Sequence, residues 1–178
     1  VSIHIATYSE PPEVVIETLN RLAALGDTNY EVIVLDNNTP DPSLYLPVRE
    51  HCRRLGNRFR FHHFDEVRGA KAGALNISLR LTHPEASKIL VLDADYHVNG
   101  DILRKGLAHF VDSSVALVQF PQAYRNSDSN CGLTWDYRLF FEVYMSRANS
   151  LNTVLSTGTA AFVCKHALIR SGGWSGAT

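Results

Sequence analysis

Two short apolar runs constrain most strongly what this chain can fold into. Residues 32–35 and 89–92 consist only of valine, isoleucine and leucine, without the polar residue at every second position that marks a strand with one face in water. Runs of this length and composition are typical of strands covered on both faces, as in the parallel sheets of α/β proteins. The sequence therefore predicts a buried, mostly parallel sheet with helices on both faces.

Strand-like and helix-like segments alternate along the chain. Segments rich in β-branched or aliphatic residues predict strands over 1–7, 30–36, 59–64, 88–93, 115–119 and 159–163. Apolar residues at helical spacing, with proline near the start of the first two segments, predict helices over 11–26, 42–55, 70–81, 101–111 and 133–149. This βαβα order predicts a Rossmann-like, doubly wound sheet formed by one domain, residues 1–178.

The composition favours a single soluble domain. With 178 residues, 45% of them hydrophobic, the chain can bury one core. A net charge of −1 from interspersed charges excludes a general attraction to nucleic acid or anionic lipid. Cys52, Cys131 and Cys164 are odd in number and lack Cys-x-x-Cys spacing, which argues against a disulfide framework or a zinc site and favours a reducing compartment. No apolar run approaches the roughly 20 residues of a membrane span.

Polar residues follow three of the predicted strands. They are Thr7-Tyr8-Ser9-Glu10, Asp36-Asn37-Asn38 and Asp93-Ala94-Asp95. In doubly wound sheets ligands bind beyond the carboxyl ends of the strands, so we expect these residues to face one crevice. Asp93 and Asp95 offer hard oxygen donors at i and i+2, which suit Mg²⁺ or Mn²⁺ and, through the metal, a diphosphate.

Each candidate site residue also has another interpretation. Asp93 and Asp95 can merely cap the turn after a buried strand, or belong to an aspartyl phosphotransferase motif with a nucleophilic first aspartate. Lys71, at a predicted helix N-terminus after Gly69, can hold a phosphate or be a solvated surface lysine. Asp36 can bind a base or ribose or form an Asx-turn. Asn76 can be an ordinary polar residue of a helix surface.

Taken in order, the motifs resemble those of glycosyltransferase family 2, in its cellulose-synthase-like branch. Residues 6–11 (Ala-Thr-Tyr-Ser-Glu-Pro) resemble the family's Pro-Thr-Tyr-Asn-Glu opening, with Ala6 and Ser9 as departures, and residues 34–38 resemble its first acidic motif. Residues 71–76 resemble Lys-Ala-Gly-x-x-Asn, and residues 93–95 the Asp-x-Asp motif. Residues 118–122, 157–160 and 172–174 match later landmarks. The resemblance covers essentially the whole chain and implies a GT-A-type fold.

The resemblance also implies roles for particular residues. Thr7, Tyr8, Glu10 and Asp36 would line the nucleoside pocket, and Lys71 would approach the diphosphate. Asp93 would face the ribose and diphosphate, and Asp95, with Asp93, would hold Mg²⁺ or Mn²⁺. Gly158, Thr159 and Trp174 would lie near the donor sugar and the acceptor, where the Trp174 ring can stack on a sugar face.

The implied activity is inverting transfer of a hexose from a nucleotide sugar to a growing polysaccharide. Residues 36–39 and 121–125 look closest to bacterial glucan-forming members that use UDP-glucose. The parent protein would be membrane-embedded, with this domain on the cytoplasmic face of the bacterial inner membrane. The alternative is a degenerate, glycosyltransferase-like module that senses a nucleotide without catalysis.

The catalytic base of the family is not found in this sequence. Its Thr-Glu-Asp motif, expected just after Gly172-Gly173-Trp174, and the later Gln-x-x-Arg-Trp are missing, so we expect a piece of a longer protein, with the base beyond Thr178. Asp128, Asp136 and Glu142 are the other acids considered, and we expect them on a solvated face. This chain is therefore predicted to bind nucleotide weakly and to turn over little or nothing.

Several histidines and aromatic residues admit a functional interpretation that we do not favour. Adjacent residues of a strand point to opposite faces, so His62 and His63 cannot share a metal ion there. His97 follows the Asp-x-Asp motif and is expected to be a turn residue rather than a ligand. The aromatic residues of segment 133–149 have helical spacing, which favours packing over a sugar-stacking platform. They are Trp135, Tyr137, Phe140, Phe141 and Tyr144.

Overall fold

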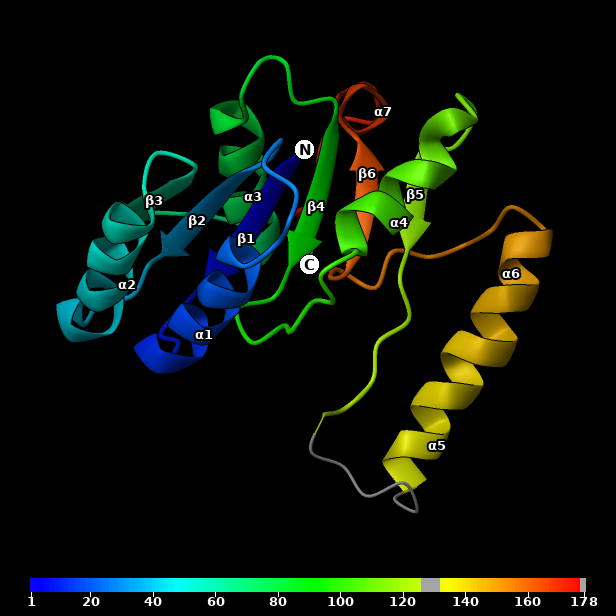
Figure 1. Cartoon of the computed structure of the whole chain (residues 1–178), viewed down its shortest axis with the longest axis horizontal. Helices are drawn as coiled ribbons and strands as arrows, with labels where there is room; N and C mark the ends of the chain where they lie inside the picture. The colour runs from blue at the N-terminus through cyan, green and yellow to red at the C-terminus, as the bar shows by residue number, and fades with distance from the viewer. Residues whose placement is uncertain (126–131, 177–178) are drawn as a thin grey trace.

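A twisted mixed sheet forms the centre of the protein (Figure 1). The computed structural model describes residues 1–125 and 132–176, so the inferences on Cys131, Asp128 and Thr178 fall outside the described residues. The strands lie in the order β3-β2-β1-β4-β6-β5. Their bounds are β1 (Ser2–Thr7), β2 (Glu31–Asn37), β3 (Phe59–Phe64), β4 (Lys88–Leu92), β5 (Leu117–Gln119) and β6 (Ala161–Cys164).

The first four strands are parallel, as the apolar runs predict. β1 pairs with β2 and β4, and β2 pairs with β3, all in parallel. β6 is antiparallel to both of its neighbours, β4 and β5. The predicted, mostly parallel sheet is therefore confirmed, with β6 inserted between β4 and β5 although β5 comes first in the chain.

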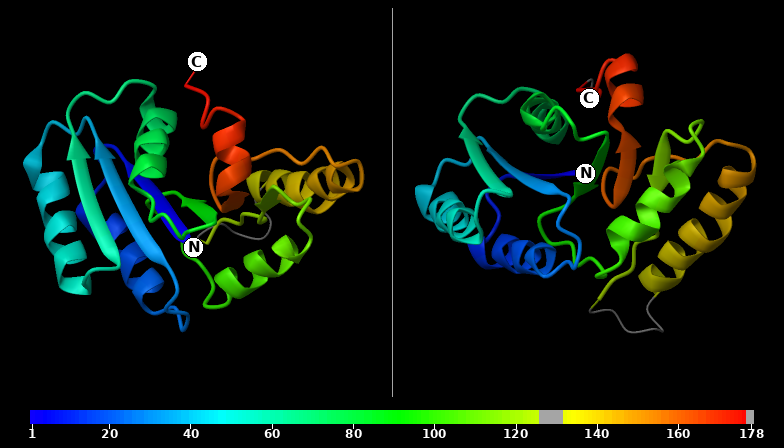
Figure 2. Two further views of the ribbon diagram at one scale, coloured as in Figure 1. Left: turned by 90° about the horizontal axis from the view of Figure 1, so that it is seen from above. Right: turned by 45° about the horizontal axis from the view of Figure 1, so that its top comes forward.

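Helices cover both faces of the sheet (Figure 2). Alternate residues of the central strands point to opposite sides: Leu90 and Leu92 join one core cluster, and Ile89 and Val91 join another. The first cluster lies under α1 (Pro12–Ala23), α2 (Pro42–Leu55) and α4 (Ile102–Ala108), which continues as a 3₁₀ turn over His109–Val111. The second lies under α3 (Ala70–Leu81) and α7 (Lys165–Arg170). Each face of the sheet thus has its own apolar core.

The predicted helix over 133–149 is one long helix with an irregular centre. α5 (Gly132–Arg138) and α6 (Ser146–Ser150) are joined by a π-helical segment, Leu139–Met145. This helix lies on the β5 side of the sheet and extends away from it (Figure 1). α7 was not predicted, because its six residues span less than two helical turns and carry little periodic signal. No helix within the described residues is both long and apolar enough to cross a membrane.

Candidate functional site

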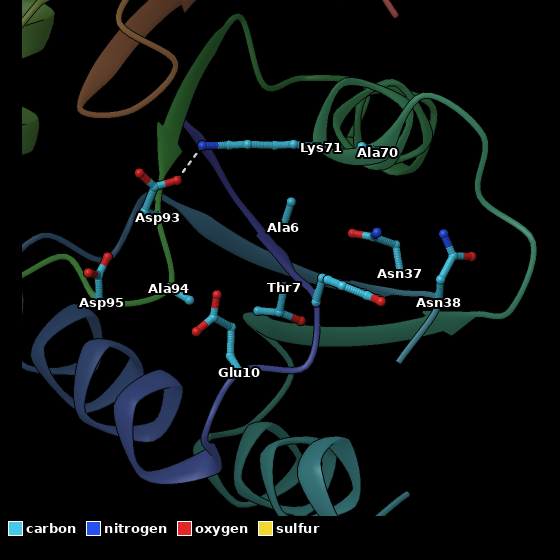
Figure 3. A pocket seen from close by; sticks show the side chains of 11 residues that line it. Ala6, Thr7, Glu10, Asn37, Asn38, Ala70, Lys71, Asp93, Ala94 and Asp95 are labelled. Atoms are coloured by element: carbon cyan, nitrogen blue, oxygen red, sulfur yellow. Dashed lines mark hydrogen bonds and ion pairs between the residues drawn. The ribbon is translucent and has the colours of Figure 1, made fainter. Parts of the chain in front are cut away.

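A cavity of about 670 Å³ opens at the carboxyl ends of β1, β2 and β4 (Figure 3). Its walls come from four segments that are far apart in the sequence: the ends of the three strands and the start of α3. The lining residues are Ala6, Thr7, Tyr8, Glu10, Asn37, Asn38, Ala70, Lys71, Asp93, Ala94 and Asp95. The crevice expected from the polar strand ends is therefore present.

The Asp93-Ala94-Asp95 turn is held by hydrogen bonds to two different segments. The Thr18 hydroxyl of α1 donates to the Ala94 carbonyl at 2.6 Å. The Asp93 N–H donates at 2.9 Å to the hydroxyl of Thr159, which precedes β6, the strand that pairs with β4. Both threonines are buried, so the main chain of the turn is constrained while the two carboxylates line the cavity. The turn presents its acidic groups from a rigid support.

Lys71 lies across the cavity from this turn and forms an ion pair with Asp93 (Figure 3). It occupies the first turn of α3, where backbone N–H groups lack partners within the helix and favour an anion. The chain enters this turn through two residues with positive φ, Gly69 at 82° and Ala70 at 46°. Lys71 and the helix N-terminus together can hold a phosphate group.

An asparagine clamp supports the loop that leads into α3. Asn38, at the end of β2, donates from Nδ2 to the Val67 carbonyl and accepts from the Val67 N–H at Oδ1, both at 2.8 Å. The loop before Gly69 is thereby tied to a strand end that also lines the cavity. We expected Asn37 and Asn38 to face the crevice because they lie at the end of a predicted strand, although neither was given a specific role. Both line the cavity.

Negative charge accumulates on the side of the cavity opposite Lys71. Burial, together with the charges of Asp95 and Asp93, raises the pKa of the Glu10 carboxyl. Such an environment fits a divalent cation, and carboxylate oxygens are ligands that Mg²⁺ and Mn²⁺ accept. The described residues contain no cluster of three or more His, Cys, Asp or Glu side chains placed to hold a metal. Asp93 and Asp95 line the cavity as two carboxylates, and a cation held by them would take its remaining ligands from phosphate and water, as Mg²⁺ often does.

Asp36 is not among the side chains that line this cavity, and its implied place in a nucleoside pocket stays a prediction. Its side chain is only 3% exposed and accepts hydrogen bonds from Thr7 Oγ1 at 2.9 Å and Thr39 Oγ1 at 2.7 Å. His63 Nδ1 donates to the other carboxylate oxygen at 2.7 Å. The Thr39 hydroxyl in turn accepts the Ser9 N–H at 2.8 Å. Asp36 therefore supports the loop after β1 through its hydrogen bonds to Thr7 and Thr39.

His63 belongs to this network and has carboxylates on both sides. Its Nε2 donates to Asp65 at 2.9 Å, and its ring stacks on Tyr45 with centroids 3.9 Å apart. Burial opposes the charged form, but the hydrogen bonds to Asp36 and Asp65 dominate and raise the pKa of His63. His97 lies near Glu17, at 3.3 Å, and contacts Arg125. Both histidines are therefore engaged by charged neighbours.

The residues expected near the donor sugar and acceptor lie outside the cavity lining. The Thr159 hydroxyl accepts a hydrogen bond from the Asp93 N–H and so supports the turn that carries Asp93. Trp174 packs its ring against the cluster of Leu75, Ile89, Val91, Val163 and Leu168. Gly158 adopts a positive φ of 84° just before Thr159. Their predicted contact with a sugar stays a prediction.

Comparisons with solved structures agree with this architecture. A mannosyltransferase from Pyrobaculum calidifontis, solved with GDP-Man and Mn²⁺, superposes with a TM-score of 0.73 at 21% identity, over 99% of this chain and 48% of that one. Staphylococcus aureus TarS 1–349, solved with UDP-GlcNAc, superposes with a TM-score of 0.67 at 16% identity, over 97% of this chain and 47% of that one. At these identities the likeness shows the fold.

Comparisons of sequence identify the family. Cellulose synthase-like protein E1 of Oryza sativa subsp. japonica is 28% identical over 133 residues, which are 71% of this chain and 17% of that protein. Glucomannan 4-beta-mannosyltransferase 1 of the same plant is 27% identical over 157 residues, 83% of this chain and 30% of that protein. The chain thus spans less than a third of these relatives. The family model described as "Glycosyl transferase family 2" matches residues 2–171, and the chain belongs to this family.

Proposed function

We propose that the cavity binds a nucleotide sugar and that, in the parent protein, the bound hexose is transferred with inversion to a growing polysaccharide. One observation carries this proposal: the Lys71 ammonium pairs with Asp93 in the same cavity that Asp95 and Glu10 line. A cationic group and a cluster of carboxylates in one cavity fit a diphosphate that binds together with a divalent cation.

The proposed role of each residue follows from its position in the cavity. Tyr8 is 59% exposed at the cavity, so its ring is available to a nucleobase, and Thr7 lies beside it. Lys71 and the N-terminus of α3 would hold the diphosphate. Asp95, with Asp93, would hold Mg²⁺ or Mn²⁺, which when bound offsets the negative charge that develops on the departing nucleoside diphosphate.

The proposed donor is UDP-glucose and the proposed acceptor a polysaccharide chain. The resemblance to glucan-forming members supports the donor, and the names of the rice relatives, a cellulose synthase-like protein and a glucomannan mannosyltransferase, support the acceptor. The solved neighbours bind GDP-Man and UDP-GlcNAc, so the fold accommodates different nucleotides and sugars. The general base stays predicted beyond Thr178, and the location at the cytoplasmic face of a bacterial inner membrane stays part of the proposal.

Isothermal titration calorimetry tests the nucleotide site directly. UDP and GDP are titrated into the chain with Mn²⁺, with Mg²⁺ and with EDTA. We expect binding of UDP that requires the divalent cation and that weakens at least tenfold in Asp95→Asn. Asp136→Asn, at an exposed position of α5, is the matched control and should bind like the parent. Equal affinity of Asp95→Asn and the unmutated chain for UDP would refute the assigned metal role. A lack of binding of either nucleotide to the unmutated chain would refute the proposed function.

A further inference from the structure

Asn76 and Trp174 are joined by a pair of hydrogen bonds although 98 residues separate them. Asn76 Nδ2 donates to the Trp174 carbonyl at 2.8 Å, and the Trp174 N–H donates to Asn76 Oδ1 at 2.9 Å. One side-chain amide thus satisfies both main-chain polar groups of Trp174, as a neighbouring strand would. Asn76 is not an ordinary polar residue of a helix surface.

The chain before and after Trp174 is shaped to fit this clamp. Gly173 has a φ of 86°, and a Cβ at this position would lie 2.6 Å from Asn76 Oδ1. Any side chain there would collide with the clamp, because real Cβ atoms essentially never approach that closely. Before Trp174, the N–H groups of Gly172 and Gly173 donate to the main-chain carbonyls of Ile169 and Leu168, respectively, near the end of α7. The glycine pair turns the chain from α7 onto the surface of α3.

This segment then crosses the start of α3. Gly176 lies against Gly69, since a Cβ on Gly69 would be 3.6 Å from the Gly176 Cα. Gly69 is the residue before Ala70 and Lys71, both of which line the cavity. Trp174 packs against the core cluster that contains Leu75 and Leu168, on the α3 side of the sheet. Residues 172–176 are therefore fixed at two points, at Asn76 and at Gly69, beside the cavity rim that carries Lys71.

From these contacts we infer that Asn76 is a positioning residue: it places residues 172–176 beside the turn of α3 that carries Lys71. The inference rests on the proposed function, because it assigns this segment to the diphosphate side of a nucleotide site. If a nucleoside diphosphate engages Lys71, the ligand contacts the same helix turn that the segment covers. We therefore expect binding of the ligand to change the order of the segment, and the order of the segment to change the affinity for the ligand by the same factor, because energetic coupling is reciprocal.

Fluorescence of Trp174 reports on the segment. The sequence contains two tryptophans, so the Trp135→Phe background leaves Trp174 as the single reporter. In this background Asn76→Ala removes both hydrogen bonds of the clamp, and Asn76→Asp keeps an acceptor for the Trp174 N–H but loses the donor. Asn20→Ala is the control, because Asn20 is an exposed residue of α1 whose side chain is paired with His51, away from the cavity.

Acrylamide quenching of Trp174 is measured in each protein without ligand and with UDP plus Mn²⁺. We expect Asn76→Ala to raise the quenching constant at least twofold and to abolish its response to ligand, while calorimetry still shows UDP binding, weakened about three- to tenfold. Asn76→Asp should lie between Asn76→Ala and the background protein, and Asn20→Ala should match the background. Circular dichroism checks that each variant keeps its fold.

The outcomes separate this inference from the proposed function. If quenching in Asn76→Ala and Asn76→Asp equals that of the background, Asn76 does not position the segment and the inference is wrong. A raised quenching constant with an unchanged ligand response would show that the segment is independent of the nucleotide site, which also contradicts it. If the unmutated chain binds no nucleoside diphosphate, the proposed function is wrong, and the expected coupling between nucleotide binding and the segment is wrong too. The ligand-free quenching still decides whether Asn76 places Trp174.

Discussion

Lys71, in the first turn of α3, forms an ion pair across the cavity with Asp93, the residue that directly follows β4. The two side chains are 40% and 36% exposed, so water reaches the pair and an incoming anion can compete for the lysine. A diphosphate that binds Lys71 would release Asp93 toward a cation. Such an exchange of partners would link the phosphate side of the cavity to its acidic side.

Replacing Lys71 should therefore affect binding more than stability. We expect Lys71→Met to weaken UDP binding at least tenfold and uridine binding less than twofold, because the nucleoside lacks the phosphates. The free energy of unfolding should change by less than about 1 kcal/mol, since exposed ion pairs contribute little. Lys105→Met is the matched control, because Lys105 also pairs with an aspartate, Asp101 at 3.0 Å, outside the cavity. An equal loss for UDP and uridine would contradict the role in holding phosphate.

His63 should make the protein more stable on the acidic side of neutrality. Its pKa is raised in the folded state, so the folded chain binds the proton more tightly than the unfolded chain, in which a histidine has a pKa of about 6.5. The stabilisation is complete below that value and is lost as pH rises through the folded pKa. The side chain is partly exposed, so the gain should stay below about 1 kcal/mol.

Urea unfolding of His63→Gln and the parent between pH 5.5 and 8.5 checks this prediction. The difference in unfolding free energy between the two proteins should be largest at the acidic end and should decline as pH rises. His166→Gln, at an exposed position of α7, should track the parent throughout. A difference that grows with pH would show that His63 is not charged in the folded state.

His4 should have the opposite dependence in a lower pH range. Burial lowers its pKa to about 4, and its Nε2 is bonded to the hydroxyls of Ser2 and Thr82 at 3.0 and 2.9 Å. Below pH 6.5 the unfolded chain takes up a proton that the folded chain refuses, so this contribution to stability falls as pH drops from 6.5 to about 4. The span corresponds to about 3 kcal/mol, at about 1.4 kcal/mol per pKa unit.

The His4→Gln variant separates this contribution from those of other groups. Glutamine can still hydrogen-bond but does not titrate, so its unfolding free energy should decline less steeply than that of the parent between pH 6.5 and 4.5. Thermal unfolding followed by circular dichroism at several pH values gives both slopes. Parallel slopes would mean that His4 is not kept neutral by burial.

Gly73 should tolerate no side chain. A Cβ there would lie 1.8 Å from the Arg68 carbonyl oxygen, and this neighbour is backbone in the loop that leads to Lys71. We expect Gly73→Ala to lower the free energy of unfolding by at least about 3 kcal/mol, the upper range for inserting an atom into a packed site. Gly100→Ala is the control, since nothing lies within 4 Å of a Cβ at that position. Urea denaturation of both variants tests the contrast.

Much of the fold could be predicted from local patterns. The predicted bounds of α2, α3 and β3 agree with the structure, because each element combines a clear period with start or stop signals such as Pro42 and Gly56. The apolar run at 89–92 predicted a strand covered on both faces, and its residues do divide between two cores. The meeting of the three strand ends at one cavity followed from the parallel order.

Other features of the site depend on contacts between distant segments. The resemblance implied that Asp36 lines a nucleoside pocket, which stays a prediction. No local pattern showed that Thr7, Thr39 and His63 converge on this side chain and bury it. The hydrogen bond from Asp93 to Thr159 requires β6 to lie beside β4, a pairing that no local pattern predicts. Nothing around Asn76 indicated that it would hold Trp174.

The sequence by itself determined most of the succession of strands and helices along the chain, the sheet faces that must be buried, and the acidic and cationic residues that reach the carboxyl edge. Hydrophobic periodicity and the geometry of strand ends act over a few residues, so these features can be read locally. Only the tertiary structure decided which carboxylate pairs with Lys71, how Asp36 is buried, and which asparagine bonds the main chain of Trp174. These choices depend on hydrogen bonds and close approaches between residues that become neighbours only when the chain is folded.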